Sequence, residues 1–182
     1  MFLDNGDGTF TLRFFRNGES EYVTVDRYLP TLSWSGKSPY AQYGSAPTSA
    51  NNELWVALIE KAYAQLNESG WISQDGTNRY AGIEGGWMSG PIREILGGSS
   101  QARSISRTTK QEILDVLATD AAMTVGISGT AQFGAVDDHA YTLTAYNPET
   151  ETFYLQNPWG KSHVSLTWEQ LSAMDTYVIW SA

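Results

Sequence analysis

The dipeptide Asn17-Gly18, which lies between two alternating apolar runs, constrains the fold of this chain more than any other feature. Residues 9–16 carry phenylalanine or leucine at every second position, and residues 21–28 return with tyrosine and valine before Pro30. Asn-Gly favours a two-residue hairpin turn with positive φ angles, and the alternation is typical of strands with one buried face. The sequence therefore predicts an antiparallel β-hairpin near the N-terminus.

A second hairpin is predicted in the last third of the chain. Residues 139–146 and 152–157 are rich in side chains that favour strands, and the segment 147–150, Asn-Pro-Glu-Thr, is typical of a turn. Further strands are expected over residues 123–128, 162–166 and 177–180. Antiparallel sheet is therefore the main structural element that the sequence predicts.

Helices are expected between and beside these strands. Residues 52–66 carry apolar side chains at helical spacing and predict one long helix that packs on a sheet. A short helix is expected over Pro91–Gly97, and the segments Thr109–Glu112 and Thr167–Gln170 have the spacing of capping boxes that open two more. We therefore expect a single domain over residues 1–182 with an α+β fold dominated by antiparallel sheet.

Composition excludes several classes of function. The chain has 11 Lys and Arg against 20 Asp and Glu, and a net charge of −9 argues against nucleic acid, because phosphate contacts need clustered cations. It has no cysteine, which rules out disulfides, thiolate metal sites and a cysteine nucleophile on this chain. No segment resembles a membrane helix or a signal peptide. We therefore expect no nucleic-acid or membrane partner and, by default, a cytoplasmic location.

His139 and Asn157 form the most informative pair of polar residues. A hairpin centred near position 148 would place them opposite each other, with Trp159 two residues further on. The Asn carboxamide could then orient the imidazole, leave its other nitrogen free to exchange a proton with a nucleophile, and be covered by the Trp ring. The alternative interpretation is an Asn-Pro turn beside a core Trp, with no catalytic role.

Adjacent carboxylates at Asp137 and Asp138 allow a further hypothesis, an acid/base hydrolase that uses both. Neighbouring residues on a strand point to opposite faces, so two such carboxylates do not easily share one substrate. The sequence therefore favours the pair of His139 and Asn157 over the two aspartates.

Five segments in the same order resemble the second lobe of the calpain protease core, a papain-like cysteine peptidase. They are Tyr22–Pro30 with its Asp-x-x-Leu-Pro ending, Glu53–Ala64, Tyr80–Gly86 with its Gly-Gly turn, His139–Leu143 and Leu155–Gly160. In that family, a mainly helical first lobe carries the catalytic Cys, and a β-rich second lobe carries the His and the Asn. The resemblance spans nearly the whole chain and points to the second lobe alone.

The resemblance implies a role for each residue of the predicted site. His139 would be the general base and thiolate partner, Asn157 its orienting residue, and Trp159 the shield over their hydrogen bond. The implied partners are a Cys-bearing protease lobe and a polypeptide substrate, and without that lobe the chain would be an inactive half of an endopeptidase. The alternative is a stand-alone, non-catalytic binding or regulatory module derived from the same lobe.

Calcium dependence is not expected from the loops of this chain. Animal calpains carry an acidic insertion after the segment that matches Lys161–Leu166, and this chain has no acidic run there. Calcium needs six to eight oxygen ligands, and the acidic loop Asp4–Gly8 lacks the remaining spacing of an EF-hand. The short loops resemble bacterial calpain-like proteases more closely, and no cofactor or metal is predicted.

Overall fold

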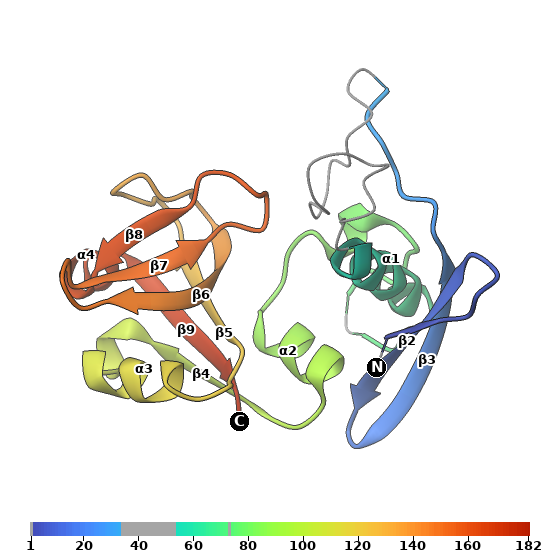
Figure 1. Cartoon of the computed structure of the whole chain (residues 1–182), viewed down its shortest axis with the longest axis horizontal. Helices are drawn as coiled ribbons and strands as arrows, with labels where there is room; N and C mark the ends of the chain where they lie inside the picture. Colours follow the sequence, from blue (N-terminus) through green and yellow to red (C-terminus); the bar gives the residue numbers. More distant parts are fainter. Residues whose placement is uncertain (1, 34–53, 73) are drawn as a thin grey trace. The chain divides into compact units, whose positions relative to one another are not determined.

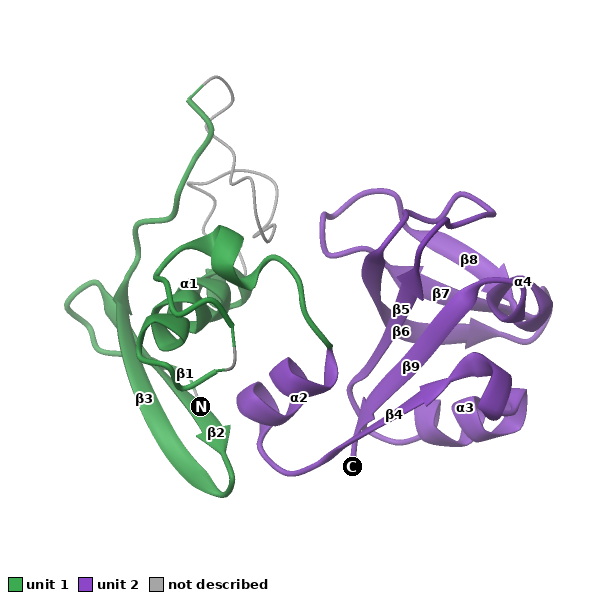
Figure 2. Ribbon diagram, turned by 180° about the vertical axis from the view of Figure 1, so that it is seen from behind, with its two compact units in different colours: residues 1–87 green, residues 88–182 purple. Residues whose placement is uncertain are grey.

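The computed structural model describes residues 2–33, 54–72 and 74–182 (Figure 1). The chain divides into two compact units, Met1–Trp87 and Met88–Ala182, which are coloured separately in Figure 2. Compactness does not show that each unit folds by itself, so the assignment of residues 1–182 to a single domain stays a prediction.

The first unit is a three-stranded antiparallel sheet with one long helix. Its elements are β1 (Phe2–Asp4), β2 (Thr9–Arg16), β3 (Glu19–Asp26), α1 (Leu54–Glu68) and the 3₁₀ helix η1 (Tyr80–Ile83). The predicted hairpin is confirmed: β2 pairs with β3, and Asn17 and Gly18 in the turn have φ angles of 53° and 84°. Both angles are positive, as a two-residue hairpin turn requires, which explains why Asn-Gly occupies it.

Helix α1 packs its apolar side on this sheet. Leu58 is fully buried, and the ring of Tyr63 lies 6.0 Å from that of Phe14 on β2. Burying one such side chain contributes about 1.5 to 3 kcal/mol. The expected helix is therefore present over the residues that the structure describes. Trp55 is one of the apolar residues at helical spacing within 52–66, which predicts a place on the buried side, but it is 49% exposed.

Lys61 on α1 connects the helix to the end of β3. Its Nζ lies 2.5 Å from Asp26 Oδ1 and donates at 2.7 Å to the carbonyl oxygen of Tyr28. The hydrogen bond from Lys61 holds the pKa of Asp26 below its usual value. These contacts give the Asp-x-x-Leu-Pro segment a structural role in this chain, which is to fix the chain where it leaves the sheet.

The second unit is a six-stranded antiparallel sheet in the order β4-β9-β5-β6-β7-β8. Its strands are β4 (Ser100–Ser104), β5 (Met123–Ser128), β6 (His139–Asn147), β7 (Thr152–Gln156), β8 (Val164–Thr167) and β9 (Asp175–Ser181). Its helices are α2 (Ser89–Leu96), η2 (Ile105–Arg107), α3 (Lys110–Leu117) and α4 (Trp168–Ser172). With the first unit, this arrangement confirms the predicted α+β fold dominated by antiparallel sheet.

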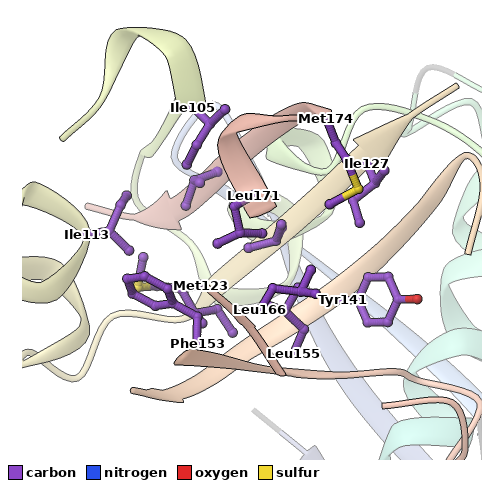
Figure 3. Packing of buried hydrophobic residues seen from close by; sticks show 13 residues of the cluster. Ile105, Ile113, Met123, Ile127, Tyr141, Phe153, Leu155, Leu166, Leu171 and Met174 are labelled. Atoms are coloured by element: carbon purple, nitrogen blue, oxygen red, sulfur yellow. The ribbon is translucent and has the colours of Figure 1, made fainter. Parts of the chain in front are cut away.

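One hydrophobic cluster forms the core of this second unit. Figure 3 shows Leu171 and Met174, from α4 and the residues after it, among side chains from the strands. Phe153 and Leu155 on β7 are fully buried. The Tyr141 ring lies at one side of the cluster, and its hydroxyl accepts the backbone N–H of Val136 at 2.9 Å. The core thus also holds the loop that leads into β6.

Both predicted capping boxes are confirmed. Thr109 and Glu112 bond reciprocally at the start of α3, and Thr167 and Gln170 do the same at the start of α4. Helix α2 begins at Ser89, two residues before the predicted proline start. None of the described helices is long and apolar enough to cross a membrane.

Candidate active site

His139 is the first residue of β6 and lies on the side of the sheet that faces the core. Tyr141 follows two residues later on the same side, and its ring meets the imidazole edge-on at a centroid distance of 5.0 Å. The imidazole is half-buried. Its position at the end of the strand places it at the rim of the core, where a side chain can be held by the fold and still be reached.

The structure brings Asn157 to this imidazole, although not in the predicted register. Thr142 pairs with Gln156, so the next position, Asn157, lies across from Tyr141 rather than from His139. The prediction is wrong by two residues because the turn is centred later than expected. Next to the turn, Asn147 pairs with Thr152, and this register alone would place Asn157 across from Thr142; the β-bulge at Thr144 then moves it one residue closer to His139. A shift of two residues keeps both side chains on one face, and His139 Nε2 lies 3.1 Å from Asn157 Oδ1 as a diagonal neighbour.

The hydrogen bonds of Asn157 determine which imidazole nitrogen carries a proton. Asn157 Oδ1 accepts the backbone N–H of Trp159 at 2.9 Å, so this atom must be the amide oxygen and not the amide nitrogen. His139 Nε2 must then donate its proton to the same oxygen. In the neutral ring, Nδ1 is left with a free lone pair, and no hydrogen bond to it occurs in the part of the chain that the structure describes.

Trp159 covers the imidazole. The two ring centroids lie 4.3 Å apart with an interplanar angle of 42°, and the indole remains 44% exposed. Asn157, by contrast, is only 1% exposed. The hydrogen bond between His139 and Asn157 therefore lies beneath an aromatic cover that limits the access of water, which strengthens a polar contact.

His163 also belongs to this site, and sequence reasoning gave it no role there. Its Nδ1 accepts the backbone N–H of Asn157 at 3.0 Å, and its ring lies 6.0 Å from that of Tyr154. The residue is exposed and sits in a short polar segment before β8. Nothing in its spacing predicts the contact, because the contact depends on how the intervening loop folds back.

The two aspartates before His139 hold backbone amides rather than forming an acid/base pair. Asp137 Oδ1 accepts the N–H of Ala131 at 2.8 Å, and Asp138 Oδ1 accepts the N–H of Gly129 at 2.6 Å. Asp138 itself has a φ of 46°, which reverses the chain just before β6. Their hydrogen bonds assign both side chains a part in shaping the loop that delivers His139.

The acidic loop near the N-terminus is likewise a turn. Asp4 Oδ1 accepts the N–H of Gly6, and Asp7 Oδ1 accepts both the N–H and the hydroxyl of Thr9. The hydrogen bond from the Thr9 hydroxyl, together with that from its backbone, keeps the pKa of Asp7 below its usual value. Across the described residues, no group of three or more His, Cys, Asp or Glu side chains is placed to hold a metal ion.

The chain is similar to known proteins over most of its length. A family model described as calpain family cysteine protease matches residues 2–178. Calpain clp-4 of Caenorhabditis elegans is 28% identical over 182 residues, covering 87% of this chain and 22% of the relative. Human Calpain-8 is 28% identical, covering 92% of this chain and 24% of the relative.

A plant relative shows the same likeness over a shorter region. The calpain-type cysteine protease DEK1 of Zea mays is 33% identical over 112 residues, which cover 62% of this chain and 4% of the relative. The chain thus spans about a quarter or less of each of these three relatives. Since the family model covers nearly the whole chain, this protein belongs to the calpain family of cysteine proteases.

Proposed function

We propose that this chain supplies the general base and its orienting amide to a calpain-like cysteine endopeptidase. The observation that carries the proposal is the hydrogen bond from His139 Nε2 to Asn157 Oδ1, 3.1 Å long and covered by the Trp159 ring. This contact fixes the imidazole plane and leaves Nδ1 available to a partner atom. Such a base is suited to activate a thiol.

The nucleophile has to come from elsewhere, because the chain contains no cysteine. A thiol from a Cys-bearing lobe would transfer its proton to His139 Nδ1, and the thiolate would attack the carbonyl carbon of a peptide bond. As the C–N bond breaks, the leaving amine takes that proton and a thioester remains. Water then attacks the thioester, gives a proton to His139, and releases the carboxylic acid and the thiol.

Asn157 and Trp159 support each of these steps without taking part in proton transfer. The amide oxygen accepts the Nε2–H of the imidazole in both its neutral and its protonated form, so the ring keeps its orientation while Nδ1 gains and loses a proton. The indole cover keeps water from competing for this hydrogen bond. The proposed substrate class is polypeptide.

The experiment is complementation with a separately purified Cys-bearing calpain lobe. We expect a complex that cleaves a peptide substrate, loses activity on alkylation of the thiol, and loses activity in the variant His139→Ala. Each protein alone serves as the control for background cleavage, and Asp120→Asn, at an exposed position outside the site, serves as the control for substitution as such. A complex that forms and leaves the peptide intact contradicts the role of His139.

The absence of a cysteine also favours one alternative, a non-catalytic binding or regulatory module built on the same lobe. This alternative predicts that the chain binds a protein partner equally well with and without the His139 imidazole. A chain that binds no Cys-bearing lobe in the complementation experiment supports this module and contradicts the protease assembly.

A further inference from the structure

We propose that His163 is a positioning residue that fixes Asn157 and, through it, the imidazole of His139. The inference rests on the proposed function, because it assigns Asn157 the task of orienting a general base. Its starting observation is the hydrogen bond from the backbone N–H of Asn157 to His163 Nδ1, at 3.0 Å. Because a backbone N–H can only donate, Nδ1 of His163 must accept through its lone pair. A neutral His163 ring therefore carries its proton on Nε2.

The sheet does not provide an acceptor for this backbone amide. The pairing of β7 with β6 ends at Gln156, and its pairing with β8 ends at Leu155. Asn157 comes next and is 1% exposed, so water is largely excluded from it. Buried backbone amides are almost always paired, and an unpaired one is costly. His163 supplies the acceptor at the point where the ladder stops.

The loop from Asn157 to His163 is closed by further contacts on the same residue. The carbonyl oxygen of Asn157 accepts the N–H of Gly160 at 3.1 Å, and Asn157 Nδ2 lies 3.5 Å from the carbonyl oxygen of Ser162. Ser162 has a φ of 57°, a left-handed conformation that is unfavourable for a residue with a side chain. Such a conformation persists where surrounding contacts impose it, and here it turns His163 back toward Asn157.

These contacts leave Asn157 with one orientation. Its backbone N–H is bonded to His163, and its Oδ1 lies between the backbone N–H of Trp159 and Nε2 of His139. Without the His163 acceptor, the backbone at Asn157 would be free to shift while the rest of the sheet stays paired. A shift of about 1 Å is enough to impair a catalytic arrangement. Loss of the exposed His163 side chain should therefore disturb the orientation of the His139 imidazole.

Two variants of matched shape separate the hydrogen bond from the bulk of the side chain. In His163→Asn, Oδ1 stands in the position of Nδ1 and can still accept the amide proton. In His163→Leu, a methyl group of similar size takes that place and accepts nothing. His163 is exposed, so both substitutions are compatible with the fold.

The primary readout is NMR on the chain without any protease partner. In His163→Leu we expect the backbone amide of Asn157 to exchange with solvent about tenfold faster, and the Nε2 proton of His139 to exchange faster or broaden. In His163→Asn, both protons should exchange at nearly the same rates as in the unchanged chain. Amides of the β5–β9 pair, such as Val125, serve as the internal reference for unchanged global stability.

A second readout uses the complex with the Cys-bearing lobe. His163→Leu should lower kcat about tenfold with little change in KM, and His163→Asn should restore it. Equal losses in the two variants, or exchange rates at Asn157 and His139 that His163→Leu leaves unchanged, would overturn the inference. A complex without activity even in the unchanged chain contradicts the proposed function instead, and the NMR comparison still tests the contact.

Discussion

The Oδ1 atom of Asn157 accepts the backbone N–H of Trp159 at 2.9 Å, and it accepts the imidazole proton of His139 at the same time. Replacing Asn157 with leucine removes this oxygen at nearly constant volume. We expect the free energy of unfolding to fall by about 1 to 3 kcal/mol, because two donors lose their partner, one of them a backbone N–H. Urea unfolding of the chain alone measures this loss.

The same substitution should lower kcat of the complemented protease by roughly 100-fold, since the base loses its orientation. Asn157→Asp is the matched control, because it keeps an oxygen acceptor in the Oδ1 position. Equal kcat values for Asn157→Leu and the unchanged chain would show that the amide does not orient the base.

The indole of Trp159 can be tested separately from its backbone N–H, since the N–H remains in any substitution except proline. Trp159→Ala should lower kcat of the complemented protease about tenfold, because water gains access to the hydrogen bond beneath the ring. Trp159→Phe keeps an aromatic cover and should retain most of the activity. If alanine and phenylalanine reduce kcat alike, the covering role is wrong.

The contact between Asp26 and Lys61 predicts a pH-dependent contribution to stability. The pKa of Asp26 is lowered in the folded chain, mainly by the hydrogen bond from Lys61, so its contribution is present above the unfolded value of about 3.9 and is lost as the pH falls through the folded value. Asp26→Asn should therefore destabilise the chain at pH 7 by about 1 kcal/mol or less, because the carboxylate is exposed.

The difference between Asp26→Asn and the unchanged chain should become smaller in acid, as the carboxylate of Asp26 takes up a proton. Urea unfolding at pH 7 and near pH 2.5 measures it, and Asp120→Asn at another exposed position is the matched control. A difference of the same size at both pH values contradicts the assignment to the charge of Asp26.

Substitutions at Gly126 on β5 and at Met88, the residue before α2, should have strongly coupled effects on the free energy of unfolding. A Cβ atom added at Gly126 would clash with the terminal methyl group of Met88. When Met88 is present, we expect Gly126→Ala to lower the free energy of unfolding by about 1 kcal/mol, because the methionine side chain has to move. In the Met88→Ala background, the same change should be neutral or stabilising, because glycine weakens the interior of a strand.

A double-mutant cycle on the free energy of unfolding measures this coupling. Additive effects of Gly126→Ala and Met88→Ala would show that their side chains do not compete for one space.

The sequence predicted those parts of the fold in which local chemistry and long-range packing agree. The Asn17-Gly18 turn has the φ angles that its residues favour, and the alternating apolar positions on either side form the buried face. Both capping boxes also formed, because each depends on residues only three positions apart. Strand β4, Ser100–Ser104, is polar and mostly exposed, and its pairing with β9 leaves no apolar alternation to detect.

The candidate site was predictable only in part for a related reason. The predicted register was wrong by an even number of residues, so His139 and Asn157 still share a face of the sheet. Without the bulge at Thr144 the error would be odd, and the two side chains would lie on opposite faces. The register itself depends on where the turn is centred and on the bulge at Thr144, and no turn residue or glycine in the sequence predicts that bulge. The contact of His163 with Asn157 depends on the positive φ of Ser162, a conformation that serine rarely adopts on its own.

The closed loop between Asn157 and His163 has a consequence for how relatives of this chain can differ in length. Contacts on Asn157 reach forward by two, three, five and six residues, so inserting or deleting one residue within the loop would displace several partners at once. The turn after β6, by contrast, lies at the other end of the hairpin. Length variation among homologues should therefore accumulate at that turn or beyond His163, and the spacing from asparagine to the sixth residue after it should stay constant.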